Sequence, residues 1–241
     1  MSLKKHIPNT ITALNLACGV LGVVFALDGR VDLAFALMLA AAVFDFCDGL
    51  AARVLDAYSE MGKQLDSLAD MVSFGVLPAV MMHRTMSLCT WYHGWLCYIP
   101  LAFAVFAGLR LAHFNVDERQ HSSFIGLASP VAALLCASLC CFTAFEPLSA
   151  LAQWCGTLWF IPTLALASGV LMVSGVPMFS LKFGKGMEAD SKLKFKRISF
   201  LAEAFAIAVL AIVLSGSVSL AIALVCALYI VKNLVYAIFR I

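Results

Sequence analysis

Long apolar segments recur along almost the whole chain and constrain its fold more than any other feature. Eight of them can be drawn, at residues 9–27, 33–56, 66–86, 96–114, 127–145, 151–173, 198–214 and 218–238. Each is close to the length of about 20 residues that an α-helix needs to cross a bilayer. Because backbone polar groups cannot bond to lipid, such segments span membranes as helices. The sequence therefore predicts an all-α, polytopic integral membrane protein with about eight transmembrane helices.

The composition supports this interpretation and leaves little room for a soluble domain. Of 241 residues, 63% are hydrophobic and 12% are charged, whereas soluble domains carry about 25% charged residues. We predict one transmembrane domain over residues 1–241, with core helices in 1–175, a cytoplasmic basic loop in 176–197 and a helical hairpin in 198–241. The connection at residues 215–217 is too short for anything but an antiparallel hairpin.

Cysteines and net charge indicate no further site. The nine cysteines lie mostly in apolar segments and form no C-x-x-C pair, so we interpret them as small buried apolar residues. The net charge of +2 gives no reason to expect a nucleic-acid partner.

Lysine and arginine predict the orientation. If the N-terminus is cytoplasmic, 14 of the 16 Lys and Arg fall on the inner side, and Arg30 and Arg84 alone fall outside. This agrees with the positive-inside rule. We therefore expect the protein in the cytoplasmic membrane, with both termini in the cytoplasm. The basic cluster 192–197 either anchors this topology or binds anionic headgroups.

Four aspartates form the most distinctive polar pattern. Asp45 and Asp48 share one face of a helix, and Asp66 and Asp70 share one face of the next. Both pairs border apolar segments, where charges need partners. Four facing carboxylates would repel one another unless cations lie between them, and Mg²⁺ prefers such oxygen ligands. Two ions roughly 3.5–4 Å apart would suit phosphoryl chemistry.

The spacing around these aspartates resembles a known motif. The pattern D-x-x-D-G-x-x-A-R-x8-G-x3-D-x3-D is similar to that of the CDP-alcohol phosphatidyltransferase family, and every fixed position is present: Asp45, Asp48, Gly49, Ala52, Arg53, Gly62, Asp66 and Asp70. The resemblance implies a six-helix core, a homodimer, a CDP-linked lipid donor, CMP as leaving group and Mg²⁺ or Mn²⁺, with two ions. The motif would face the cytoplasm.

The resemblance also implies roles for these residues. The four aspartates would hold metal, and Asp66 and Asp70 would be catalytic, with Asp70 completing the metal site or taking the hydroxyl proton. Small residues at Gly49 and Ala52 would leave room for a nucleotide. Arg53 would pair with phosphate or brace the aspartates. Gly62 would permit the bend between the two helices.

The start of the first apolar segment carries a polar face. Asn9, Thr12 and Asn15 recur there at spacings of three. One interpretation is a helix cap followed by a packing stripe. The family resemblance instead places Asn9 and Thr12 beside the nucleotide.

Two later segments are similar to the phosphatidylserine synthase branch of the family. Residues 109–115 and 124–130 resemble its R-L-A-R-F-N and G-L-P-S-P elements, with His113 in place of an Arg and Ala128 in place of a Pro. The resemblance implies CDP-diacylglycerol as donor and L-serine as acceptor. A cation would bind the serine carboxylate. The candidate serine-binding residues are Arg110, Asn115, Arg119 and Ser129; both arginines are also explained as positive-inside charges.

Other functions remain as alternatives. The same chemistry could use glycerol phosphate or an inositol compound as acceptor. An aspartate-rich prenyltransferase would need two separated aspartate clusters, and a cation transporter would need acidic sites in repeated halves; the chain has one cluster. Glu203 lies within an apolar segment, and Lys194–Arg197 is its candidate partner.

Overall fold

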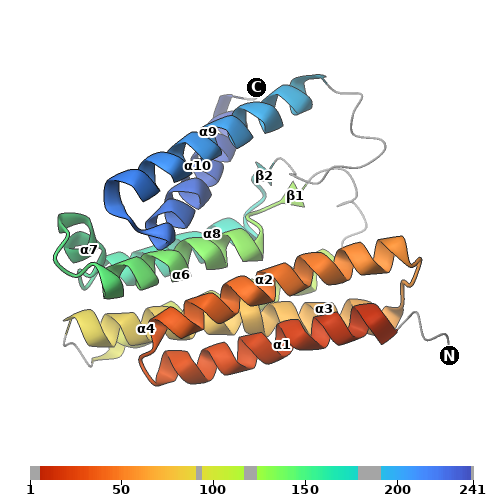
Figure 1. Cartoon of the computed structure of the whole chain (residues 1–241), viewed down its shortest axis with the longest axis horizontal. Coiled ribbons are helices and arrows are strands. Elements are labelled where there is room, and N and C mark those ends of the chain that lie inside the picture. The colour runs from red at the N-terminus through yellow and green to blue at the C-terminus, as the bar shows by residue number, and fades with distance from the viewer. Residues whose placement is uncertain (1–5, 91–93, 117–123, 179–190, 240–241) are drawn as a thin grey trace.

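The protein is a bundle of helices. The computed structural model describes residues 6–90, 94–116, 124–178 and 191–239. In Figure 1, α1 to α4 lie side by side in one layer, α6 and α8 lie against it, and the α9–α10 hairpin crosses on the outside. The helices are α1 (His6–Leu27), α2 (Val31–Val54), α3 (Glu60–Asp70), α4 (Leu77–Thr90), α5 (Ala102–Val116), α6 (Ser129–Phe145), α7 (Ala150–Cys155), α8 (Phe160–Val173), α9 (Ser191–Ser215) and α10 (Val218–Phe239).

Short non-α elements complete the chain. A π-helical segment, Met71–Val76, joins α3 to α4, and a 3-10 helix, Trp95–Leu101, leads into α5. Strands β1 (Phe124–Ile125) and β2 (Pro177–Met178) form a small antiparallel pair in which Phe124 faces Met178. This pair ties the segment before α6 to the segment after α8.

The predicted membrane fold is confirmed. Within the described residues, six helical segments are long and apolar enough to cross a membrane, at residues 6–27, 31–54, 60–89, 95–116, 198–215 and 218–239. Two shorter apolar helices, α6 and α8, occupy the positions of the fifth and sixth predicted spans. The chain is an all-α, polytopic membrane protein.

The sixth span differs from its prediction. We expected one helix over 151–173, but α7 ends at Cys155 and α8 begins at Phe160. Gly156 caps the end of α7, and Thr157 N–H donates to the carbonyl of Trp154 in a turn. Gly156 at the end of α7 and Pro162 in the first turn of α8 both favour a break between the two helices.

Two predicted boundaries near the second and third connections were also wrong. We expected the third span to begin at Asp66, yet α3 begins at Glu60, where the Ser59 hydroxyl accepts from Gly62 N–H at 3.0 Å. We expected a loop over 86–95, but α4 continues to Thr90. The predicted interfacial Trp91 and Tyr92 lie outside the described residues, and Trp95 is 70% exposed.

The C-terminal hairpin begins inside the predicted basic loop. Helix α9 starts at Ser191, and the turn at Gly216, with φ of +67°, leads into α10. Glu203 pairs with Lys232 of α10 at 2.7 Å, whereas the side chains of Lys194–Arg197, the partner that we expected, lie outside the described residues. Antiparallel helices bring Glu203 and Lys232 together although 29 positions separate them.

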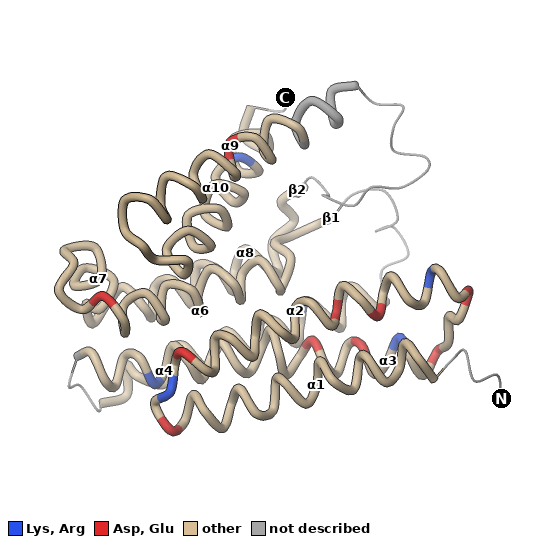
Figure 2. The backbone as a smooth tube through the Cα atoms, viewed as in Figure 1, with Lys and Arg blue, Asp and Glu red and all other residues tan. Residues whose placement is uncertain are grey.

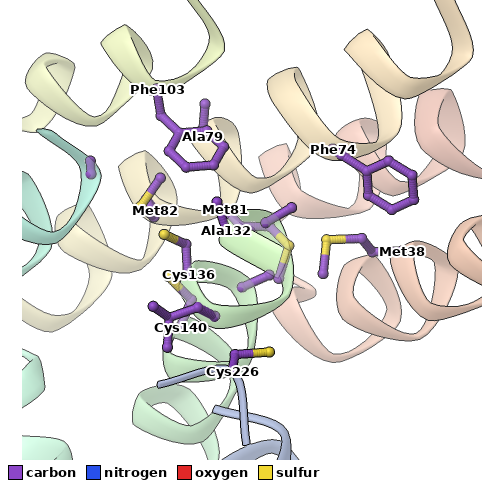
Figure 3. Close-up of a cluster of buried hydrophobic side chains, with 14 of the residues drawn as sticks. Met38, Phe74, Ala79, Met81, Met82, Phe103, Ala132, Cys136, Cys140 and Cys226 are labelled. Carbon is purple, nitrogen blue, oxygen red and sulfur yellow. The ribbon is translucent and has the colours of Figure 1, made fainter. Parts of the chain in front are cut away.

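The core is rich in methionine and cysteine. Figure 3 shows Met38, Phe74, Met81 and Cys136 converging from α2, the π-helical segment, α4 and α6. Their unbranched or small side chains fill gaps between closely packed helices. Figure 2 shows that charged positions of α3 and of the C-terminal half of α2 gather toward the end of the bundle near the N-terminus. The site residues therefore lie at one end of an apolar body.

Candidate active site

Three of the motif aspartates converge between two helices. Asp45 and Asp48 lie on α2 and Asp66 lies on α3, and each offers a carboxylate oxygen within 4.8 Å of the others. Helix α1 packs against both α2 and α3. Its Thr12 hydroxyl donates to Asp48 Oδ2 at 2.6 Å. The predicted convergence of the first three metal-ligating residues is therefore present in the structure.

Asp70 follows Asp66 by one turn of α3 and is not one of these three converging carboxylates. It interacts electrostatically with Asp45, Asp48 and Asp66, and also with Arg110 of α5. Its Oδ1 is buried and has no hydrogen-bond partner among the described residues. The π-helical segment begins directly after it, a feature common at functional sites. Clustered carboxylate oxygens, one of them unsatisfied, fit hard divalent cations such as Mg²⁺ or Mn²⁺.

Helix α1 packs against the π-helical segment that follows Asp70. Ser73, in the π-helical segment, donates to Asn15 Oδ1 at 2.7 Å, and both side chains are buried. Gly19 makes this approach possible, since a Cβ there would lie 2.4 Å from Ser73 Oγ. Of the predicted polar face, Asn15 thus has a packing role, while Thr12 contacts the aspartate cluster.

A cavity of about 690 Å³ adjoins the aspartates. Its lining includes most of the residues predicted to contact a nucleotide: Asn9, Thr12, Gly49, Ala52 and Gly62, together with Asp48 and Asp66. Arg53 is exposed and does not belong to the lining. A cavity of this size next to a carboxylate cluster can hold a small polar ligand.

Sequence reasoning missed part of this lining. Tyr58, Ser59, Glu60 and Lys63 also line the cavity. They come from the α2–α3 connection and the first turn of α3, a stretch that lies between the predicted spans 33–56 and 66–86. Ser59 followed by a polar turn is an N-cap signal that could have placed the helix start. Lys63 adds a cation beside the cavity, and Tyr58 adds an aromatic ring.

Gly49 and Gly62 differ in their surroundings. A Cβ at Gly49 would meet nothing within 4 Å, whereas one at Gly62 would lie 2.9 Å from Asn9 Oδ1. Gly62 therefore permits close packing of α1 and α3. Gly49 lines the cavity and has no side chain, so the space beside it is open to a ligand.

A larger side chain at position 49 should block the cavity without unfolding the protein. We expect Gly49→Val to raise the KM for the CDP-linked lipid that the motif predicts as donor roughly five- to 150-fold, because overpacking costs about 1–3 kcal/mol. Thermal unfolding in detergent should stay unchanged. Ala36→Val, on an exposed part of the same helix, is the control. Equal KM values for both variants would mean that position 49 does not face the ligand.

Of the predicted serine-binding residues, Arg110 interacts electrostatically with Asp70. Arg110 Nη1 donates to Ser129 Oγ at 2.8 Å, and Ser129 is buried at the start of α6. Asn115 Nδ2 donates to Ser67 Oγ at 2.9 Å, which joins α5 to the helix that carries Asp66 and Asp70. Arg119 lies outside the described residues.

Gly126 fixes the backbone before α6. Its φ is +80°, and a Cβ there would lie 2.4 Å from the Met172 carbonyl oxygen. Its N–H donates to the carbonyl of Val176 at 2.9 Å. A glycine is required at this close approach, and the turn that it makes precedes Ser129 on the chain.

The chain belongs to the CDP-alcohol phosphatidyltransferase family. Residues 5–161 match the sequence model of that family. This stretch includes all four aspartates, the cavity lining and the Arg110–Ser129 pair. The family assignment argues against the prenyltransferase and the transporter alternatives.

Several relatives carry a more specific name. A Mycobacterium bovis protein named CDP-diacylglycerol–serine O-phosphatidyltransferase is 37% identical over 179 residues, 71% of this chain and 60% of its own length. A Bacillus subtilis protein of the same name is 34% identical, over 63% of this chain and 84% of its own. An archaetidylserine synthase of Methanothermobacter thermautotrophicus is 33% identical, over 70% and 68%. The match thus spans less than two thirds of the mycobacterial relative.

Proposed function

We propose that the protein transfers the phosphatidyl group from CDP-diacylglycerol to L-serine, which yields phosphatidylserine and CMP. The observation that carries this proposal is the cluster of Asp45, Asp48 and Asp66, of which Asp48 and Asp66 line the 690 Å³ cavity. The names of the relatives support serine as acceptor. The cation Arg110 next to Asp70 also supports an acceptor that brings a carboxylate.

Each part of the site has a role in this reaction. The cavity beside Gly49 and Ala52 would hold the cytidine diphosphate part of the donor. Asp70 would accept the proton of the serine hydroxyl as its oxygen attacks the lipid-side phosphorus. The bond from that phosphorus to the bridging oxygen breaks, and CMP leaves with the electron pair. Arg110 would hold the serine carboxylate so that the hydroxyl stays near Asp70.

The proposal includes two divalent ions, Mg²⁺ or Mn²⁺. Asp45, Asp48, Asp66 and Asp70 would hold them, since the donors are carboxylate oxygens and Oδ1 of Asp70 is unsatisfied. When bound, such ions would neutralise negative charge on the diphosphate. Arg53, which is exposed, would reach phosphate from outside the cavity.

We further propose a location and an assembly. The positive-inside distribution of Lys and Arg supports a cytoplasmic membrane location with the aspartates facing the cytoplasm. The family resemblance supports a homodimer.

Purified protein and an acceptor panel test the proposal. CMP release from CDP-diacylglycerol is measured with Mg²⁺ or Mn²⁺ and with L-serine, glycerol phosphate or inositol. We expect release with serine and little with the others. Preferential release with another alcohol would keep the phosphatidyl transfer and reject serine. A CDP-linked archaeal ether lipid, offered in parallel, identifies the donor class.

A further inference from the structure

A second cavity lies at the end of the bundle opposite the aspartates. Its volume is about 580 Å³, and its wall combines the α1–α2 turn, α4, the end of α6 and α7, through residues that include Gly29, Thr85, Leu88, Thr143 and Gln153. Figure 1 shows α7 and the α1–α2 turn at one end of the bundle and α3 at the other. The two cavities share no lining residue among those described, so this one is a separate site.

One wall of this second cavity carries a hydroxyl that the protein leaves without a hydrogen bond. Thr85 of α4 is 1% exposed, and its Oγ1 makes no hydrogen bond within the described residues. The thiol of Cys140 is a neighbour, but sulfur is a weak acceptor. Burying a hydroxyl costs free energy unless it is hydrogen-bonded. An oxygen acceptor placed in the cavity would therefore gain a bond from Thr85.

A guanidinium lies beside the same cavity. Arg84 Nε and Nη2 are 3.6 and 3.7 Å from the position that a Cβ at Gly29 would occupy, and Leu88 Cδ1 is 3.8 Å from it. Gly29 and Leu88 both line the cavity, which places Arg84 at its edge. Arg84 Nε is buried and has no hydrogen-bond partner in the part of the chain that the structure describes. Asp28, the acid next to Gly29 in the chain, is exposed and is not part of the lining.

The surroundings of the cavity suit an amphiphile at a membrane surface. Trp154 of α7 and Trp159 before α8 are 60% and 64% exposed, and tryptophan is enriched where membrane proteins meet the headgroup layer. Leu88 is 47% exposed, so apolar surface continues outward from the two donors. A ligand that carries both an anionic group and hydrocarbon chains matches both parts.

We propose that this cavity binds the phosphate of an anionic membrane phospholipid, with Arg84 and Thr85 as donors to its oxygens. Phosphate oxygens accept hydrogen bonds, and bonds from an arginine to them are charge-assisted and strong. Basic pockets between transmembrane helices bind lipid headgroups in this way. The described lining holds no carboxylate that could pair with a headgroup ammonium. Phosphatidylglycerol therefore fits the site better than phosphatidylethanolamine.

The first test removes the charge of Arg84 in the full-length protein. Binding of phosphatidylglycerol in detergent is measured by native mass spectrometry and by the rise in thermal unfolding temperature. We expect Arg84→Gln to raise the Kd at least about tenfold, the smallest effect expected for a lost charge-assisted hydrogen bond. Arg30→Gln is the matched control, because Arg30 is exposed in the same turn, stacks on Phe25 at 5.5 Å and does not line the cavity. Equal weakening in both variants would mean unspecific charge attraction and overturn the site.

The second test removes the Thr85 hydroxyl and keeps a side chain of similar shape. Without lipid, Thr85→Val should unfold at the same or a higher temperature than the wild type, because a buried hydroxyl without a hydrogen bond is lost. With phosphatidylglycerol, its Kd should rise at least about threefold, as for one hydrogen bond. A lower unfolding temperature without lipid would show that Thr85 already bonds within the protein. That result, or an unchanged Kd, would contradict the proposal.

A ligand panel separates a lipid from a soluble anion. Phosphatidylglycerol, phosphatidylethanolamine and inorganic phosphate are compared at equal concentration with wild-type protein and Arg84→Gln. We expect phosphatidylglycerol to bind most tightly and inorganic phosphate to leave the unfolding temperature unchanged. An equal shift with inorganic phosphate would reject a lipid, and equal binding of phosphatidylethanolamine would reject an anionic headgroup. None of these measurements uses CMP release, so their outcome is independent of the proposed transferase reaction.

Discussion

Asp45→Asn is expected to reduce CMP release by about 10²–10³-fold or more while the protein still folds in detergent. Asp45 lies with Asp48 and Asp66 in a cluster whose carboxylate oxygens are within 4.8 Å of one another. An amide keeps the size of the side chain and removes its charge, so the loss falls on cation binding and not on packing. Electrostatic stabilisation of transferring phosphates is worth several kcal/mol.

The measurement combines turnover with metal affinity. Binding of Mn²⁺, followed by electron paramagnetic resonance, should weaken in Asp45→Asn in parallel with activity. Asp56→Asn is the matched control, because Asp56 is exposed on the same side of the bundle and has a φ of +47°, which asparagine tolerates well. Near-normal turnover in Asp45→Asn would refute the metal assignment of this residue.

The apolar pattern of the sequence predicted the helices but not all of their ends. Segments such as 6–27 and 31–54 are long and apolar enough to cross a membrane, so the sequence alone predicts that a helix is present in each. The apolar pattern does not report the start of α3, since Glu60 and Lys63 are polar. This start depends on the local cap from Ser59. The break at Gly156 was hidden within a continuous apolar run.

The candidate site was predictable where residues share one helix and less so where helices meet. Spacing placed Asp45 with Asp48, and the family motif placed Asp66 with them; the structure brings these three together. The Asn115–Ser67 hydrogen bond and the Glu203–Lys232 pair join positions 48 and 29 residues apart. Such contacts depend on how helices pack, and no periodicity in one segment reports them.

Arg110→Ala is expected to raise the KM for serine by at least about tenfold and to leave the KM for the CDP-linked lipid nearly unchanged. A charge-assisted hydrogen bond to a carboxylate is worth roughly 1.5–3 kcal/mol, about 10- to 150-fold in affinity. Arg110 interacts with Asp70, so a carboxylate that it binds would bring the attached hydroxyl close to the proposed base. The donor cavity, lined by Gly49 and Asp48, does not include Arg110.

Three outcomes of this experiment distinguish the roles of Arg110. A rise in the serine KM alone supports acceptor binding, and Ser129→Ala, which removes the 2.8 Å contact to Nη1, should then give a smaller change in the same direction. If both KM values rise together, Arg110 contacts phosphate or supports the fold. If neither changes, Arg110 serves as a positive-inside charge and Arg119 becomes the candidate to test. Arg30→Ala should change neither KM, because Arg30 precedes the N-terminal end of α2, whereas Asp45 and Asp48 lie in the second half of that helix.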